Sequence, residues 1–597
     1  MYLDRVRRQF PAVVLALTAG ARAEEPAGSS PTLSTEISAG GIARVGERDP
    51  GLVGISNGGT GRSINYDDGN LNYGRGLASL AVQGRSILAA NSEHVDLAVE
   101  AVYFYDFLNA NGNTEFHDLT EESRSRAGRG IYLNDAYLGL QDARNDERIA
   151  IRAGNQRLRW SDSPSFGQSI APVNPVAASR RYMPGNTAKD LVVALPMIFA
   201  EAATRSHWSA SAFYLLGFEP SEPEAAGTFL NSNDYYSPGS RYLQLSALVP
   251  DTDASVTTPA TPFGSRVTRG PDRMPASGGQ FGVRLETPEM GHASVVLSAY
   301  GMRVHAREPL VSVHTGTLGG LLGATAADYA SSGNYFLEYP KGVTVFGGAL
   351  RLEPAAHTRL NADFSMRIRQ PLQIDDQLLT TAGLAPAAAT VACAPNPASP
   401  PCVGTLAALN GNPVIAGLGG ISAANAGTWF DRDLQGFERF DVSQWALGVT
   451  QGLPSVAGAA RWYATAEAGG VYVHGFRSDF LDASVTVRPD ENGDTRNGFA
   501  TRSAWGYRLY SRIDFPGVAG LKTVSPSVAW MHDVHGNAPI TLGTLLQGTK
   551  SCIAAVDAAL DEKLSARVSY RAWFGRGNDA DRYTDRDFVA FSLTRKF

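Results

Sequence analysis

The sequence predicts an all-β protein: a transmembrane antiparallel β-barrel of roughly 14–20 strands, with an N-terminal segment or an inserted loop partly filling the lumen. Three observations predict it. The chain begins with an export signal, apolar and polar residues alternate along extended segments, and short turn-rich links alternate with long polar segments.

The first residues contain the three parts of a secretory signal peptide. The basic stretch MYLDRVRRQF is followed by the apolar stretch PAVVLALTAG and by Ala21-Arg22-Ala23, which matches an A-x-A cleavage site. We expect residues 1–23 to be the signal peptide of an exported protein. We interpret residues 24–76 as a periplasmic, plug-like segment and residues 77–597 as the barrel.

Period-two alternation is the main structural signal. In residues 358–369, TRLNADFSMRIR, one face carries Leu360 and Phe364, and the other carries Asp363 and Arg367. Residues 564–574 and 505–515 repeat the pattern. Weaker versions lie at residues 97–106, 208–218, 293–304 and 524–533.

The length of these segments indicates a membrane. Strands of soluble sheets usually have about five or six residues, whereas a tilted strand that crosses a bilayer needs about ten. Backbone groups in lipid need partners inside the protein, so spanning strands must close into a barrel. The apolar faces would then meet lipid, and the Arg-rich faces would line the lumen.

The predicted lumen charges are a candidate selectivity site. They either form a constriction that selects solutes or pair with one another to hold the wall together, and both interpretations stay open. The set comprises Arg359, Asp363, Arg367, Arg369, Arg508, Arg512, Asp514, Arg567 and Arg571.

The connections and the last strand fit the same fold. Residues 515–526 and 452–462 are short links suited to periplasmic turns. Residues 587–597 alternate and end on Phe, which resembles the signal read by the bacterial barrel-insertion machinery. The polar segments predicted as extracellular loops are residues 217–242, 249–280, 377–437 and 479–501.

The longest loop, 377–437, contains two of the three cysteines. Cys393 and Cys402 bracket a Pro-rich stretch, and an exported chain can oxidise such a pair. We therefore expect a disulfide there, whereas Cys552 has no evident partner.

The stretch INYDDGNLNYGRG, residues 64–76, raises the question of a metal site. An EF-hand is excluded, because its sixth position is Tyr73 instead of Gly and its twelfth is Ser79 instead of Glu. We predict no metal and interpret the stretch as a junction into a first full strand at 77–88. A different oxygen-rich calcium site stays open as the alternative. The junction residues, with the two aspartates expected to face cationic lumen residues, are Asp67, Asp68, Asn70 and Asn72.

Other function classes find little support. The net charge is −6 and no Lys/Arg run occurs, so we expect no nucleic-acid partner. Gly54-Ile-Ser56-Asn-Gly58 matches G-x-S-x-G, but no helix follows it and no His or Asp partner can be assigned. We predict that the protein is not an enzyme and needs no cofactor.

The chain resembles a family of large proteobacterial outer-membrane barrels known only as a domain of unknown function. The resemblance implies an outer-membrane barrel and a genomic association with exporters of the resistance-nodulation-division type, with a periplasmic lipoprotein as a further partner. It assigns no catalytic residues, and the chain departs from the family at Ser161-Asp162-Ser163, where a Gly-Glu pair is expected. The matching segments include RDPGLVGI (48–55), DDGNLNY (67–73), YFYDF (103–107), YFLEYP (335–340), WALGVTQ (445–451) and WMHDVHG (530–536).

These observations predict a channel or transport component in the outer membrane of a Gram-negative bacterium, in contact with outer-membrane lipid. From the family association we expect a small hydrophobic or amphipathic solute: a lipid, a sterol or an aromatic compound. One alternative is a non-conducting structural or assembly partner of a periplasmic exporter system. An outer-membrane hydrolase is the least favoured hypothesis.

Overall fold

The computed structural model describes residues 31–61, 64–246, 248–251, 263–323, 328–453, 458–483, 499–543, 545–575 and 583–597. The predicted signal peptide lies outside the described residues. Within them, no helix combines the length and the apolar character that a membrane-crossing helix requires.

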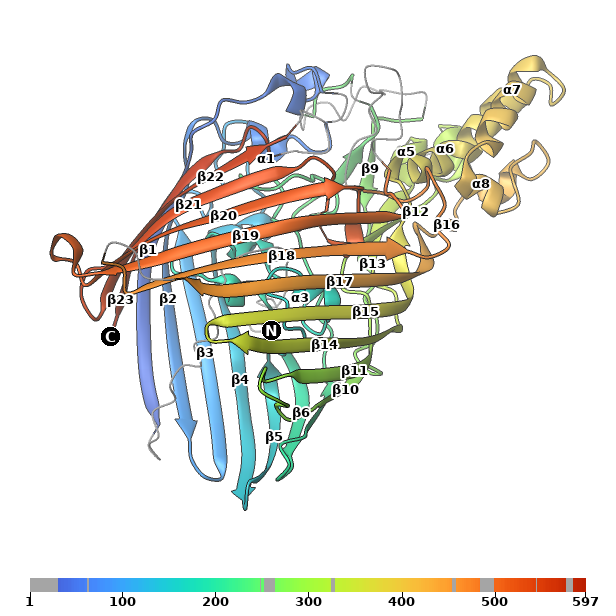
Figure 1. The fold of residues 1–597 in the computed structure, drawn as a ribbon. Helices are drawn as coiled ribbons and strands as arrows, with labels where there is room; N and C mark the ends of the chain where they lie inside the picture. Colours follow the sequence, from blue (N-terminus) through green and yellow to red (C-terminus); the bar gives the residue numbers. More distant parts are fainter. Residues whose placement is uncertain are drawn as a thin grey trace.

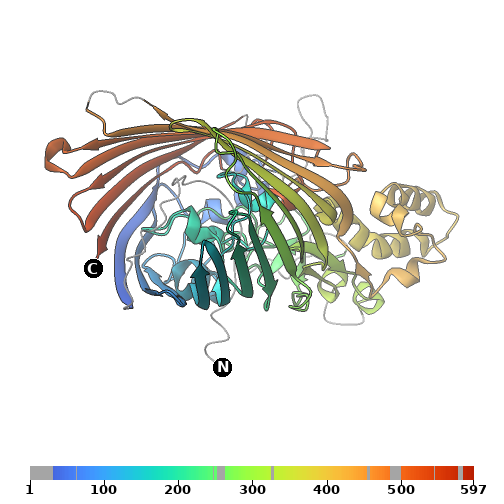
Figure 2. The same cartoon turned by 60° about the horizontal axis from the view of Figure 1, so that its bottom comes forward.

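Eighteen strands form one closed antiparallel sheet (Figure 1). Each strand pairs with its neighbour in chain order, and β1 pairs with the last strand, β23, from Glu36↔Lys596 to Arg44↔Phe588. In Figure 2 the yellow-to-red strands arch over the blue-to-green ones, and the β5–β6 segment lies between the two arcs. The strands are β1 (Thr32–Arg44), β2 (Gly76–Asn91), β3 (Val95–Asp106), β4 (Arg129–Arg144), β5 (Glu147–Gln156), β6 (Leu195–Ala203), β7 (Ser209–Leu215), β10 (Phe281–Glu286), β11 (Val296–Val304), β14 (Val343–Ala355), β15 (Thr358–Gln373), β17 (Phe437–Leu453), β18 (Arg461–Val473), β19 (Ser503–Pro516), β20 (Thr523–His535), β21 (Lys550–Ala559), β22 (Leu564–Phe574) and β23 (Phe588–Lys596).

The wall is apolar outside and polar inside. On β15, the Phe364 side chain is 51% exposed, whereas its neighbours Asp363 and Ser365 are 3% and 0% exposed. A soluble protein would bury the Phe and expose the Asp. The inversion matches a strand with lipid on one side and a polar interior on the other, so the predicted fold class and the predicted orientation of the two faces are confirmed.

The connections divide the barrel into two ends. Short turns join β2–β3, β4–β5, β6–β7, β14–β15 and β19–β20 at the end where β1 begins and β23 finishes. The β4–β5 turn uses Asn145 and Asp146 at φ 51° and 64°, the left-handed conformation that a two-residue hairpin favours. In bacterial barrels the short-turn end is periplasmic and the long-loop end extracellular.

The long loops carry the remaining elements. A second, five-stranded sheet contains β8 (Tyr242–Gln244), β9 (Arg266–Arg269), β12 (Leu310–His314), β13 (Asn334–Glu338) and β16 (Asp433–Leu434). The helices are α1 (Asp68–Leu71), α2 (Glu121–Ser123), α3 (Gly167–Ile170), α4 (Leu318–Leu321), α5 (Tyr329–Ser332), α6 (Asp376–Cys393), α7 (Pro400–Asn410) and α8 (Pro413–Gly417).

The N-terminal boundary of the barrel differs from the prediction. The described part of the predicted segment 24–76 is not a separate periplasmic plug, because Thr32–Arg44 is strand β1, which closes the barrel between β2 and β23. The described residues that follow β1, 45–61 and 64–75, belong to the first long loop, so they lie at the end opposite the short turns. The error arose because β1, TLSTEISAGGIAR, lacks bulky residues on a clean alternating face.

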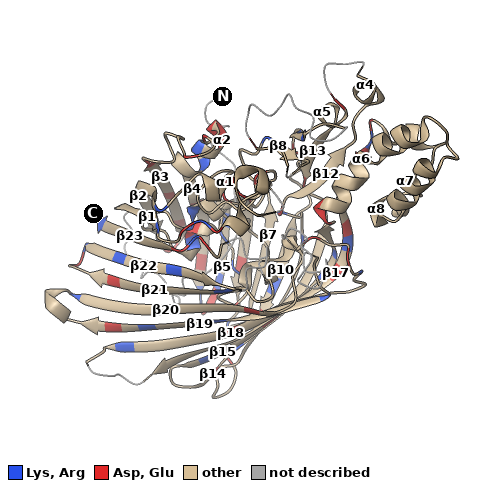
Figure 3. Cartoon of the chain, turned by 90° about the horizontal axis from the view of Figure 1, so that it is seen from above, with Lys and Arg blue, Asp and Glu red and all other residues tan. Residues whose placement is uncertain are grey.

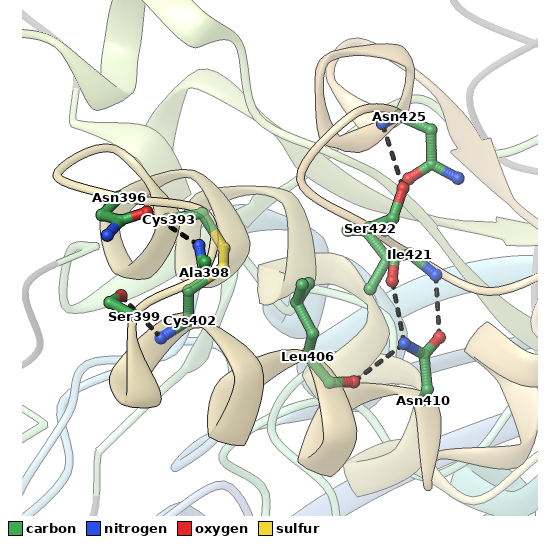
Figure 4. Close-up of a disulfide and its surroundings, with 10 residues drawn as sticks. All are labelled: Cys393, Asn396, Ala398, Ser399, Cys402, Leu406, Asn410, Ile421, Ser422 and Asn425. Carbon is green, nitrogen blue, oxygen red and sulfur yellow. Dashed lines mark hydrogen bonds between the residues drawn. A yellow bond between two sulfur atoms is a disulfide. The ribbon is translucent and has the colours of Figure 1, made fainter.

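Helices α6–α8 project from the long-loop end, and a disulfide joins Cys393 to Cys402 (Figure 4). Ser399 caps α7 through its hydroxyl, which accepts from the Cys402 N–H at 3.4 Å. Residues 377–430 contain no Asp, Glu, Lys or Arg, and α7 and α8 are uncoloured in Figure 3, where charges colour the strands. Asp376, the first residue of α6, lines the lumen cavity described below, and no other residue of the three helices does.

Removing this disulfide should loosen the helices without changing conduction. The bridge closes a loop across a sequence separation of 9, for which loop-closure entropy corresponds to about 2–3 kcal/mol. We expect Cys393→Ser/Cys402→Ser to speed cleavage of 377–430 by thermolysin, since trypsin has no site there. Unchanged cleavage, or an altered conductance, would contradict this assignment.

Candidate functional site: the obstructed lumen

The loop between β5 and β6, residues 157–194, folds into the barrel and reaches the opposite wall. The Ser161 hydroxyl donates to Asp363 Oδ1 on β15 at 2.7 Å, and the Asp162 N–H donates to the same oxygen at 2.9 Å. The lumen is therefore obstructed by an inserted loop. The tripeptide Ser161-Asp162-Ser163 belongs to the part of the loop that contacts this wall.

A second carboxylate holds the same loop. The Ser163 hydroxyl donates to Glu467 Oε1 on β18 at 2.5 Å, and the Ser165 N–H donates to Glu467 Oε2 at 2.8 Å. From β15, the Arg367 guanidinium donates to the Ser169 carbonyl. Charge-assisted hydrogen bonds of this kind are stronger than neutral ones, so the loop is fixed to the far wall at several points.

The base of the loop is fixed by an ion-pair network on the near wall. Arg157 contacts Glu100 at 2.7 Å and Asp135 at 2.6 Å. Arg85 contacts Glu100 at 2.9 Å and Asp190, within the loop, at 2.6 Å. These residues were not among those predicted from the sequence, although Glu100 lies on the polar face of the predicted strand 97–106, which is the signal that indicates it.

A cavity of about 1350 Å³ extends beside the inserted loop. At the short-turn end it is lined by Glu353, Arg359 and Thr450, and at the long-loop end by Tyr235 and Leu542. Its lining thus reaches both ends of the barrel.

Charged and aromatic side chains meet on this cavity. The arginines at 159, 367 and 571 line it, and within the described residues none of them has a carboxylate within 4.0 Å. The Arg571 guanidinium lies 4.5 Å from the ring centre of Trp573. Aromatic and apolar residues that also line the cavity are Leu158, Trp160, Tyr182, Leu230, Leu542, Trp573 and Tyr583.

Eight of the nine predicted lumen residues fall into three groups. Arg359, Arg367, Arg508 and Arg571 line the cavity, and Asp363 holds the inserted loop. A third group is a paired wall cluster outside the cavity lining. Its contacts are Arg512–Asp514 at 2.9 Å, Arg512–Asp557 at 2.8 Å and Arg567–Asp557 at 2.8 Å.

Arg369 does not line the lumen, contrary to the prediction. The register with β17 shifts between Arg367 and Gln370, and both of these residues are buried. Arg369 has a φ of 57° and is exposed. A bulge adds a residue to one strand and breaks the alternation, which the sequence pattern did not indicate.

The junction residues also differ from the prediction. Asp67 is buried and accepts hydrogen bonds from the Gly54 N–H and the Asn57 amide, and it faces other carboxylates instead of cationic lumen residues. The Asn70 amide donates to Asp585, and the Asn72 amide donates to the Gly227 carbonyl. Residues 55–57, which include Ser56, form a 3-10 helix instead of a strand–turn–helix elbow.

Glu308, a loop residue on the cavity, should make ion selectivity depend on pH. Burial raises the pKa of Glu308 to about 7. A hydrogen bond from Ser221 and the positive charges of Arg367 and Arg307 act in the opposite direction, but burial has the larger effect. The carboxyl group is therefore neutral below this pKa and negative above it. We expect the permeability ratio of chloride to potassium to rise as the pH falls through 7, measured from reversal potentials across a planar bilayer.

The Glu308→Gln variant should reduce this pH dependence. Glu438→Gln is the matched control, because Glu438 lies outside the cavity lining and pairs with Arg477. An equal pH dependence in the wild type and Glu308→Gln would contradict the assignment.

Taken together, the closed antiparallel wall, the apolar exterior and the obstructed polar lumen define a porin-like transmembrane β-barrel. The chain belongs to the family described as "Protein of unknown function (DUF1302)", whose model matches residues 9–597. No curated protein matches the chain.

Solved outer-membrane structures have a distant likeness to the chain. OccAB1 of Acinetobacter baumannii is 10% identical with a TM-score of 0.39, over 97% of this chain and 99% of that one. OpdO of Pseudomonas aeruginosa is 11% identical with a TM-score of 0.34, over 95% and 96%. Salmonella typhi OmpF in complex with daunomycin is 9% identical with a TM-score of 0.33, over 96% and 98%.

Proposed function

We propose that the protein is a channel in the outer membrane of a Gram-negative bacterium, through which a small amphipathic solute passes. The observation that supports this most directly is the cavity of about 1350 Å³, which runs beside the inserted loop inside a closed barrel. The closed sheet of the described strands directs a solute along the axis, and the inserted loop narrows the path.

The lining suggests the class of solute. Arginines without a carboxylate within 4.0 Å attract an acidic group, and the half-buried Leu158, Tyr182 and Tyr583 offer apolar surface nearby. A solute with an apolar body and one acidic group fits both features. Passage would require binding that is weak enough for release.

Planar-bilayer recording of the purified mature chain tests the proposal. We expect discrete conductance steps, and we expect decanoate or a steroid carboxylate to interrupt the current at concentrations where glucose does not. Arg159→Ala/Arg571→Ala should shorten the interruptions, whereas Arg567→Ala, a change at a paired wall arginine outside the cavity lining, should not. A folded barrel that never conducts would instead support a non-conducting partner of an exporter system.

A further inference from the structure

A cluster of carboxylates lies among the long loops, apart from the cavity. Asp67 and Asp68 belong to the β1–β2 loop, and Asp234 belongs to the β7–β10 loop. One carboxylate oxygen of each lies within 4.8 Å of the others. Asp68 also belongs to a second, overlapping group with His117 of the β3–β4 loop and Asp251. None of these residues lines the cavity.

The cluster brings like charges together in a buried place. Asp67 and Asp234 are 0% and 8% exposed. Burial, followed by the charges of Asp68, Asp67 and Asp251, raises the pKa of Asp234 well above its usual range. Within the described residues, no Lys or Arg lies within 4.0 Å of Asp67 or Asp234 to compensate. Buried carboxylates normally have a paired cation or a metal ion.

Two buried oxygens of the cluster provide a second, independent observation. Asp67 Oδ2 accepts from the Gly54 N–H at 2.8 Å, and Asp234 Oδ2 accepts from the Asp68 N–H at 3.3 Å. The other oxygen of each carboxylate, Oδ1, is buried and has no hydrogen-bond partner in the described part of the chain. A buried polar atom without a partner is rare, and an ion is one of its explanations.

We propose that Asp67, Asp68 and Asp234 bind a divalent cation of the oxygen-preferring class, Ca²⁺. Calcium takes carboxylate oxygens at 2.3–2.6 Å, so oxygens around one ion lie up to about 5 Å apart, and the carboxylate oxygens of this cluster meet that limit. Three carboxylates without a thiolate or imidazole favour a hard cation over zinc. The overlapping group with His117 is the competing zinc arrangement, which the experiment below separates.

The ion would tie two long loops together at the extracellular end. Asp67 and Asp68 precede β2, and Asp234 lies between β7 and β8. An ion bound to all three would join segments that are 166 positions apart, counted from Asp68 to Asp234. His117 Nδ1, 3.3 Å from Asp68 Oδ1, brings in the β3–β4 loop. The site orders the mouth of the barrel and does not depend on the identity of the solute.

Terbium luminescence on the full chain in detergent tests the site. Tb³⁺ replaces Ca²⁺ on oxygen ligands, and tyrosine sensitises its emission; the Tyr242 hydroxyl donates to Asp251 at 2.7 Å, next to the cluster. We expect sensitised emission that Ca²⁺ displaces. Asp67→Asn/Asp234→Asn should weaken the binding of both Tb³⁺ and Ca²⁺ by more than roughly tenfold. Asp118→Asn, a control at an exposed residue, should leave the binding of both ions unchanged.

Thermal unfolding and Zn²⁺ titration decide cases in which emission alone is ambiguous. In EDTA, Asp67→Asn/Asp234→Asn should unfold at or above the wild-type temperature, because the neutral amides relieve repulsion. In Ca²⁺ only the wild type and Asp118→Asn should gain stability. Three outcomes would overturn the proposal. The first is emission that Ca²⁺ cannot displace, and the second is emission that the double substitution does not affect. The third is tight Zn²⁺ binding that requires His117, found without any Ca²⁺ binding.

Discussion

Replacing residues 161–170 with a short Gly-Ser linker is expected to raise the single-channel conductance by roughly twofold or more, since an 18-stranded barrel is wide enough for an aqueous channel once unobstructed. This segment carries the anchors to Asp363 and Glu467 on the far wall. Removing it takes the obstruction away without changing the strands. The measurement is the conductance in a planar bilayer, together with the loss of current interruption by decanoate.

A matched control separates the obstruction from general loosening. Placing the same linker at residues 288–293, in the β10–β11 turn, shortens a connection that does not line the cavity. We expect the wild-type conductance there. If both variants, or neither, conduct more than the wild type, the inserted loop is not the constriction.

Asp585→Ala should destabilise the barrel by about 3–5 kcal/mol, the cost of leaving a buried charge without its partner. Arg44, at the end of β1, is 1% exposed, and its guanidinium contacts Asp585 Oδ2 at 2.9 Å. The same carboxylate accepts from the Asp49 N–H and the Asn70 amide. Asp585 thus joins the first long loop to the last one, beside the seam between β1 and β23.

Urea unfolding of the barrel in lipid vesicles, followed by the folded-to-unfolded band shift on electrophoresis, measures this cost. Glu47→Ala is the control, because the Arg75–Glu47 pair is exposed, with side-chain exposures of 67% and 80%. Exposed pairs contribute about 0–1 kcal/mol. Equal unfolding midpoints for the two variants would show that the Arg44–Asp585 contact does not stabilise the seam.

The strands and their two faces could be predicted because a strand places successive side chains on opposite sides. Residues 564–574, predicted from alternation, coincide with β22, and 358–369 lie within β15. Strand β1 was missed, because its small residues give no clear alternation, and Arg369 was misplaced, because a bulge leaves no signature in the pattern.

By itself, the sequence determined the barrel class, the strand faces and the cysteine pair considered for a disulfide, since these depend on local period and composition. Only the tertiary structure decided which loop enters the lumen, how the barrel closes and which carboxylates meet. Ser161 and Asp363 are 202 residues apart, and Arg44 and Asp585 are 541 apart. Contacts at such separations depend on how the closed wall brings its loops together, and no local pattern encodes that arrangement.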